Sequence, residues 1–321
     1  MRFIIYGAGA IGGAVGARLH EHGHDVILIA RGRHFEAIRD RGLVLQSPEG
    51  SAVLSIPVVD DPGQIKFIES DVVILAMKTQ DTAAALVRLS AAADHPPAVV
   101  CAQNGVENER LALRWFADVY GMYVMMPATH LEPGVVEASS TPVTGILDLG
   151  RYPSGVDRVA EDIAAALETA TFRSQAVPAI MRWKYAKLLT NLGNSVEAAC
   201  GLQARNSALF ERARAEGEAC LAAAGIEWAS GEEQDARRGE FIRIRPVEGR
   251  RREGGSSWQS LARGAGTIET DWLNGEIVLL GRTHGVDTPV NALLQRVAAR
   301  MAREGAPPGS YTVAELLSEL G

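Results

Sequence analysis

The stretch RFIIYGAGAIGGAVGARLHEHGHDVILIAR, residues 2–31, decides the fold. Residues 2–6 form a short β-branched and aromatic run that predicts a buried strand, and residues 24–31 predict a second strand. Between them, GAGAIG at 7–12 leads into a helical segment at 12–23. A strand, a GxGxxG motif, a helix and a strand within about thirty residues are typical of a dinucleotide-binding βαβ unit.

The three glycines of GAGAIG have separate predicted tasks. Gly7 permits the tight turn, Gly9 lets the backbone approach a pyrophosphate, and Gly12 lets the helix pack closely on the strand. The N–H groups at the start of the helix then bind the phosphates. A glycine-rich turn that binds nothing is the alternative, and the strand–helix–strand context argues against it. The expected cofactor-binding residues of this loop are Gly7, Ala8, Gly9, Ala10, Ile11 and Gly12.

The end of the second strand indicates which dinucleotide binds. An NAD site usually carries Asp or Glu there, to accept a hydrogen bond from the ribose 2′-hydroxyl. Here the strand ends in Arg31, followed by Gly32, Arg33 and His34. A guanidinium group makes forked, charge-assisted hydrogen bonds that suit a 2′-phosphate. We therefore expect NADPH/NADP+ as the cofactor, with Arg31 as its selecting residue and Arg33 as a solvated neighbour.

The alternation of strands and helices continues beyond this unit. Residues 70–78 and 98–105 predict strands, and residues 80–93 predict the helix between them. Lys78 and Asn104 lie at the C-terminal ends of these segments, where open α/β sheets bind ligands. A surface lysine and a turn asparagine are the competing interpretations. Later strands are expected at 123–130 and 140–150.

The second half of the chain has helical periodicity. Helices are expected at 156–170, 178–200, 207–225, 267–285, 291–305 and 313–320. Residues 243–255, rich in Arg and Gly, predict a solvated loop. The predicted fold is an α/β Rossmann-type N-terminal domain plus an all-α C-terminal domain. Its expected boundaries are 1–175 for the NADP-binding domain and 176–321 for the helical substrate and catalytic domain.

Composition narrows the classes of partner. The chain has 321 residues, of which 47% are hydrophobic, and a formal net charge of −7. The acidic balance argues against a nucleic-acid partner, which would require a basic patch. No apolar run reaches the roughly 18 residues of a membrane span, so no membrane partner is expected. The long C-terminal helices are compatible with a homodimer, although no residue decides it.

Cysteine usage suggests the compartment. Cys101, Cys200 and Cys220 are odd in number and far apart, with no metal-binding spacing. A disulfide framework and a metal site are therefore not expected. The apolar N-terminus superficially resembles a secretory signal, but the glycines from Gly7 to Gly16 argue against that reading. We expect a cytoplasmic protein.

An ordered set of motifs resembles the ketopantoate reductase (2-dehydropantoate 2-reductase) family over nearly the whole chain. The set is GAGAIG at 7–12, MK at 77–78, QNG at 103–105, KLLTN at 187–191, SSW at 256–258 and ETDWLNGEIVLLGR at 269–282. The glycine motif alone is shared by many dehydrogenases. The resemblance implies NADPH-dependent reduction of a 2-oxo acid, namely 2-dehydropantoate to (R)-pantoate in pantothenate and coenzyme A biosynthesis.

The resemblance also implies residue roles. Lys187 corresponds to the family's catalytic acid, and Asn191 is its helical companion. Glu269 corresponds to a catalytic glutamate that meets the substrate hydroxyl and also the cofactor, and Ser257 corresponds to a serine that binds substrate. Lys78 and Asn104 match positions near the nicotinamide and the substrate, so Asn104 is expected to meet both.

The residues themselves support part of this assignment. Lys187, Asn191 and Asn194 are spaced i, i+4 and i+7, so they share one face of a continuous helix. A lysine ammonium next to a ketone oxygen supplies both charge stabilisation and a proton. The family usually has another asparagine eight residues after the lysine, but here that position is Ser195. Whether Asn194 or Ser195 contacts substrate stays open, and Lys184 is the competing catalytic lysine.

Three other functions fit some of these features. A related reductase acting on another 2-oxo acid is one. A 3-hydroxyacid dehydrogenase of the 6-phosphogluconate dehydrogenase type also joins a Rossmann domain to helices bearing Lys-x-x-x-Asn, but the segment at Glu269 and the spacing to Ser257 favour ketopantoate reductase. A non-catalytic NADPH sensor would keep the glycine loop without needing Lys187 or Glu269.

Overall fold

The computed structural model describes residues 1–320, in two compact units. Unit 1 comprises Met1–Lys184 and Ser230–Arg252, and unit 2 comprises Tyr185–Ala229 and the chain from Glu253 onward. The expected boundary at 175/176 therefore differs from this division, because residues 176–184 and 230–252 belong to unit 1. Gly321, the last residue of the expected second domain, lies outside the described residues.

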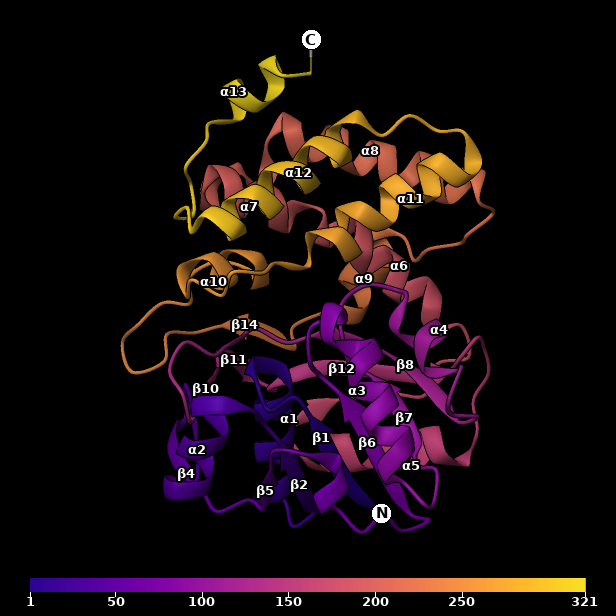
Figure 1. The fold of residues 1–321 in the computed structure, drawn as a ribbon, viewed down its shortest axis with the longest axis vertical. Helices are drawn as coiled ribbons and strands as arrows, with labels where there is room; N and C mark the ends of the chain where they lie inside the picture. Colours follow the sequence, from indigo (N-terminus) through magenta and orange to yellow (C-terminus); the bar gives the residue numbers. More distant parts are fainter. Residues whose placement is uncertain (321) are drawn as a thin grey trace. The chain divides into compact units, whose positions relative to one another are not determined.

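The main sheet of unit 1 is built from the predicted βα units. Its strands are β1 (Arg2–Tyr6), β2 (Asp25–Ile29), β5 (Val58–Val59), β6 (Asp71–Leu75), β7 (Ala98–Cys101), β8 (Val119–Met125), β12 (Gly145–Arg151) and β13 (Phe172–Arg173). Their order is β13-β12-β8-β7-β6-β1-β2-β5 (Figure 1). Only the β8–β12 pairing is antiparallel among these strands, so β1, β2, β6, β7 and β8 share one carboxyl edge.

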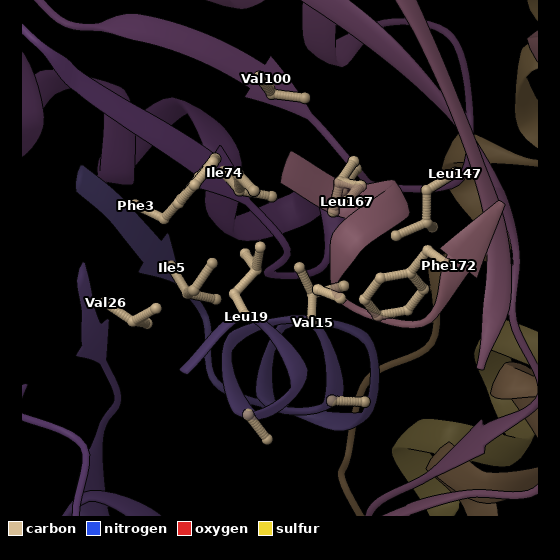
Figure 2. Close-up of a cluster of buried hydrophobic side chains, with 14 of the residues drawn as sticks. Phe3, Ile5, Val15, Leu19, Val26, Ile74, Val100, Leu147, Leu167 and Phe172 are labelled. Carbon is tan, nitrogen blue, oxygen red and sulfur yellow. The ribbon is translucent and has the colours of Figure 1, made fainter. Parts of the chain in front are cut away.

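Helices cover both faces of this sheet. They are α1 (Ala10–Glu21), α5 (Arg158–Thr169), α3 (Thr79–Ala92) and α4 (Asn108–Ala112). Alternate strand residues point to opposite faces of a sheet. Phe3 and Ile5 therefore pack in one core with α1 and α5, whereas Ile4 packs in a second core with α3. Figure 2 shows Val15 and Leu19 of α1 projecting toward the strands in the first of these cores.

A second sheet in unit 1 was not expected. It joins β3 (Leu43–Ser47), β4 (Gly50–Leu54), β9 (Ala128–Thr129) and β10 (Val135–Ala138) in the order β4-β3-β10-β9. The segment preceding it contains α2 (Gly32–Arg41), and a short helix, η1 (Pro62–Gln64), follows. The expected strand 123–130 is thus divided between the two sheets, because β8 ends at Met125 and β9 starts at Ala128.

The segment 230–252 returns to unit 1 from the second half of the chain. It forms α9 (Gly231–Arg238) and β14 (Ile242–Ile244), which pairs antiparallel with β11 (Ser140–Pro142). Arg237 donates two hydrogen bonds to the buried Asp148 carboxylate. The expectation of a loop at 243–255 is wrong at its start, because backbone pairing with β11 makes a strand there.

The regular secondary structure in the described part of unit 2 is all helical. Helix α6 (Ile180–Asn191) passes from unit 1 into unit 2 after Lys184. The further helices are α7 (Gly193–Cys200), η2 (Leu202–Asn206), α8 (Ala208–Ala223), α10 (Ser256–Ala262), η3 (Glu269–Trp272), α11 (Asn274–His284), α12 (Pro289–Glu304) and α13 (Val313–Ser318). Their core centres on α7 and α12, with Val196, Leu294 and Val297 fully or almost fully buried.

Two expected helices of unit 2 are each divided. The expected helix 178–200 becomes α6 and α7, separated at Leu192, whose backbone stays in the helical region. The expected helix 267–285 becomes η3 and α11, separated at Leu273. None of the helices in residues 1–320 has the length and apolar character that crossing a bilayer requires.

Candidate active site

The glycine loop has the geometry of a dinucleotide site. Gly7 has φ of +104°, and a Cβ there would lie 2.6 Å from the Met77 nitrogen. At Gly12 a Cβ would lie 2.8 Å from Ile5 and 2.9 Å from the Ala76 Cβ, so α1 packs on the sheet as predicted. A Cβ on Gly9 would meet nothing within 4 Å. Open space at Gly9 and a first turn of α1 without a side-chain cap suit a pyrophosphate. Ala8, Ala10 and Ile11 complete this loop.

His34 on α2 bonds to the backbone of the same loop. Its Nε2 lies 2.6 Å from the Ala8 carbonyl oxygen, and its Nδ1 accepts a hydrogen bond of 2.8 Å from the Gly134 N–H. These two contacts require the neutral tautomer with its proton on Nε2. Burial lowers the pKa of His34 below its ordinary value. Its ring also contacts that of His130, with centroids 4.2 Å apart.

Protonation of His34 should weaken the fold in acid. Because the folded-state pKa is lowered, the unfolded chain takes up a proton first, so stability falls as pH drops below about 6.5. We expect the stability advantage of the parent over His34→Gln to shrink by roughly 1 kcal/mol between pH 7.5 and 5.5. Urea denaturation of both proteins at each pH measures this difference. An advantage that is independent of pH would contradict the bonding scheme.

Arg31 and Lys78 lie at helix starts that follow sheet strands. Arg31 is the residue before α2, and its exposed side chain is 3.3 Å from the Asp81 carboxylate in the first turn of α3. Lys78 is the residue immediately before α3. Both positions follow the carboxyl end of a parallel strand, β2 for Arg31 and β6 for Lys78. The expected placement of both residues at this edge is therefore found.

The loop that carries Asn104 is tied to the loop that carries Lys78. The Asn108 side chain donates to the Asn104 carbonyl oxygen and to the Thr79 hydroxyl, each at 3.2 Å. Asn108 also accepts a hydrogen bond from Thr82 on α3, and it is fully buried. These hydrogen bonds bring the Lys78 and Asn104 regions together, although they are 26 residues apart in the sequence. Asn104 itself is partly exposed.

Lys184 is not a free lysine. Its ammonium donates to the Glu109 carboxylate and to the carbonyl oxygens of Cys101 and Gln103, at 3.2 and 3.1 Å for the carbonyls. The Lys184 and Glu109 side chains are 3% and 0% exposed. Burial raises the pKa of the Glu109 carboxyl, and the charge of Lys184 opposes that shift. A buried ammonium that already has three acceptors is poorly suited to donate a proton to substrate.

Lys187 and Asn191 lie in the part of α6 that belongs to unit 2. Lys187 is partly exposed, whereas Asn191 is only 3% exposed. The Asn191 Nδ2 has no hydrogen-bond partner among the described residues. A buried amide without a partner is costly unless a ligand or water satisfies it. One turn of helix separates it from Lys187, so this donor lies close to the predicted acid.

Asn194 and Ser257 lie around the start of α10. Asn194 accepts a hydrogen bond of 2.9 Å from Arg205 and donates one of 3.4 Å to the Ser256 hydroxyl. Arg205 also donates to Glu197, which in turn accepts from the backbone N–H before α10. Ser257, the second residue of α10, is 2% exposed. The polar atoms of Asn194 are thus engaged within unit 2.

Ser195 points into the interior of unit 2. Its hydroxyl lies 2.6 Å from Asn274 Oδ1 and 3.1 Å from the Thr270 hydroxyl. Asn274 in turn donates to Asn291 on α12, and all four of these side chains are fully buried. Glu269, which is 9% exposed, directly precedes Thr270. Ser195 therefore contacts the segment that carries Glu269.

The cysteines are unsuited to nucleophilic chemistry. Burial raises the pKa of Cys200 to about 11, and it raises the pKa values of Cys101 and Cys220 as well. All three are free thiols. Within residues 1–320 no cluster of His, Cys, Asp or Glu could hold a metal ion.

The comparisons with known proteins cover both units. Residues 3–153 match the family described as ketopantoate reductase PanE/ApbA, and residues 179–302 match ketopantoate reductase PanE/ApbA C terminal. The 2-dehydropantoate 2-reductase of Pyrococcus horikoshii is 31% identical over 301 residues, which are 92% of this chain and 95% of the relative. The chain belongs to the ketopantoate reductase family. It is an oxidoreductase that acts on a CH–OH group.

Solved structures agree with this family and with the fold. A PanE/ApbA family ketopantoate reductase from Ralstonia eutropha JMP134 aligns with a TM-score of 0.79 and 26% identity, covering 95% of this chain and 99% of its own. D-mandelate dehydrogenase with NADH and anilino(oxo)acetate aligns with a TM-score of 0.80 and 22% identity, covering 96% and 100%. The second likeness shows the shared fold. The predicted Rossmann-type domain with a helical C-terminal region is confirmed.

Three contacts of the site were missed from the sequence. The sequence indicates Lys184 only as an alternative to Lys187, and it does not point to the partner Glu109. In the sequence, His34 stands out only as a neighbour of Arg31, and nothing gives Arg205 a predicted role. A charged residue in an otherwise apolar helical face was the available signal for Lys184, but nothing local points to a carboxylate 75 residues earlier.

Proposed function

We propose that this ketopantoate reductase family member reduces a 2-oxo acid with NADPH, that the acid is 2-dehydropantoate, and that Lys187 is the proton donor. The observation that carries the proposal is the buried Asn191 Nδ2, which lies one helical turn after Lys187 and has no hydrogen-bond partner among the described residues. This nitrogen offers a hydrogen-bond donor to a ligand close to the proposed proton donor. The name of the Pyrococcus horikoshii relative supplies the substrate.

The reaction adds a hydride to the ketone carbon and a proton to its oxygen, which gives the 2-hydroxy acid. NADPH, when bound, supplies the hydride. The Lys187 ammonium stabilises the negative charge that develops on the ketone oxygen and donates its proton there. Asn191 donates to the substrate or orients Lys187. The Glu269 carboxylate accepts a hydrogen bond from a substrate hydroxyl, and its charge favours the protonated form of Lys187.

The remaining polar residues divide into substrate contacts and supports. We assign Asn104 and Ser257 to the substrate, with the Ser257 hydroxyl meeting its carboxylate. Asn194 and Ser195 already bond within unit 2, so we assign them supporting roles. Ser195 would hold the Glu269 segment through Thr270 and Asn274. Lys78 and the glycine loop would hold the cofactor.

Arg31 is the proposed selector of NADPH over NADH. We expect Arg31→Ala to raise KM for NADPH by about 10- to 100-fold and to change KM for NADH little, because only NADPH carries a 2′-phosphate. Arg33→Ala is the matched control, since Arg33 is also exposed and lies two residues away. Initial rates with each cofactor measure the effect. Equal losses in the two variants would mean that Arg31 contributes only general positive charge.

A substrate panel tests the activity. Initial rates of NADPH oxidation are measured with 2-dehydropantoate and with other 2-oxo acids, including phenylglyoxylate, the oxidised form of mandelate. We expect the highest kcat/KM with 2-dehydropantoate, by about tenfold or more, which is a preference of about 1.4 kcal/mol in transition-state binding. A higher value with another acid would overturn the substrate assignment while keeping the reaction type.

Two alternatives have clear signatures when the panel is extended to 3-hydroxy acids with NADP+. A 3-hydroxyacid dehydrogenase would oxidise 3-hydroxy acids with NADP+ and leave 2-oxo acids unchanged. A sensor would bind NADPH and oxidise it with no member of the panel. The partly exposed Lys187 and the buried amide of Asn191 favour the reductase over the sensor, since a sensor requires neither.

A further inference from the structure

The Lys184–Glu109 pair touches the loop that carries Asn104, which the proposed function assigns to the substrate. We propose that Lys184 and Glu109 are positioning residues that hold the β7–α4 loop, and with it the Asn104 side chain, in the place needed for catalysis. This inference rests on the proposed function. It goes beyond it by assigning a role to two residues that need not touch the substrate or the cofactor.

The contacts of Lys184 act directly on the backbone of this loop. The ammonium binds the carbonyl oxygens of Cys101, the last residue of β7, and of Gln103, the residue before Asn104. Its third acceptor is the Glu109 carboxylate on α4, beyond the loop. One cation therefore joins the residue before the loop, the loop itself and the helix after it. An ammonium has three donors, and this arrangement uses all of them.

A second tie holds the other side of the same loop. Asn108, next to Glu109, donates to the Asn104 carbonyl oxygen. Gln103 donates through its side chain to Thr82 on α3. The backbone on both sides of Asn104 is thus bonded, and Gly105 at φ +81° completes the turn that follows. Asn104 itself is held at its backbone, while its side chain stays partly exposed.

Stability alone is a weak reason for such a pair. Burying two charges costs desolvation, and apolar residues of similar volume often serve a fold equally well. The chain also makes room for the lysine: a Cβ on Gly121 of β8 would approach the Lys184 Cδ to 3.3 Å. An apolar side chain at 184 would fill this space but would remove the donor that Lys184 supplies to the carbonyl oxygens of Cys101 and Gln103. Only a side chain with a hydrogen-bond donor can bond to those carbonyl oxygens.

The test removes the pair without leaving a buried charge. In Lys184→Met/Glu109→Leu we expect kcat/KM for 2-dehydropantoate to fall by about tenfold to a hundredfold, mainly through kcat, because small displacements of a substrate-positioning group have effects of that size. The Kd for NADPH should stay within about threefold, since the glycine loop is untouched. Hydrogen–deuterium exchange of the segment 102–107 should become faster. Glu109→Gln, which keeps an acceptor for Lys184, should retain kcat/KM within about threefold.

The control is a second ion pair with a buried carboxylate in the same sheet. Arg2 and Asp71 pair at the first residues of β1 and β6, which lie at the opposite edge from Asn104. Arg2→Met/Asp71→Leu should leave kcat/KM and exchange in 102–107 unchanged. If the apolar variant of the first pair does not fold, Lys184→Gln/Glu109→Gln replaces it. Glutamine has two donors on a shorter side chain, so the same changes are expected, but smaller.

The outcomes separate this inference from the proposed function. Exchange in 102–107 that is unchanged overturns the inference, whatever the activity. Faster exchange with unchanged kcat/KM also overturns it, because the loop would then not position a catalytic contact. A parent protein that reduces no 2-oxo acid refutes the proposed function instead. In that case the exchange measurement alone decides whether Lys184 and Glu109 fix the β7–α4 loop.

Discussion

Replacing Lys187 with alanine is expected to lower kcat by about 10²- to 10⁴-fold, the range that positioned general acids contribute. The fold should be retained, because Lys187 is partly exposed and alanine is the best helix former. NADPH should still bind, since Lys187 is not part of the glycine loop at residues 7–12. The measurement is kcat at saturating 2-dehydropantoate, with the Kd for NADPH determined from its fluorescence.

Lys184→Ala is the comparison that gives this result its meaning. Both lysines lie on α6; Lys184 is 3% exposed and pairs with Glu109, whereas Lys187 is partly exposed. Suppose that Lys187→Ala keeps turnover within a few-fold, while Lys184→Ala folds normally and has none. The catalytic acid would then be Lys184, and the assignment made here would be wrong.

The second large effect is on stability. Lys184→Ala is expected to lower the free energy of unfolding by about 3–5 kcal/mol, because it leaves the Glu109 carboxylate buried without its cation. Urea denaturation followed by circular dichroism measures this loss. A drop of this size is a large fraction of the stability of a typical domain.

Arg182→Ala provides the matched control on the same helix. Arg182 pairs with Glu233, but the two side chains are 32% and 42% exposed. Exposed pairs contribute about 0–1 kcal/mol, so its loss should be small. If the two variants lost the same stability, the Lys184–Glu109 pair would not be a buried ion pair in solution.

The strand, glycine loop and helix at the start of the chain were predictable because their signals are local. The strand at 2–6, the glycine motif and the placement of Arg31 all depend on neighbours within a few residues. Lys78 and Asn104 were predicted to lie at the carboxyl edge because parallel strands share that edge, and they do. Periodicity was also sufficient to predict the helical character of unit 2.

Features that depend on distant residues were not predictable. The return of 230–252 to unit 1 depends on backbone pairing with Ser140–Pro142 and on the contact between Arg237 and Asp148. The direction of Ser195 depends on Asn274, which lies 79 residues later. Helical spacing predicted one helix over 178–200, but the helix divides at Leu192, and Asn194 beyond that point bonds to Arg205 and Ser256.

The most direct test of the account is the product of one complete reaction. The purified protein is incubated with 2-dehydropantoate and a limiting amount of NADPH, and pantoate and NADP+ are quantified by NMR. The account predicts one pantoate, in the (R) configuration, for each NADPH consumed. NADPH that binds to the protein but stays unoxidised, with no pantoate formed, would contradict it.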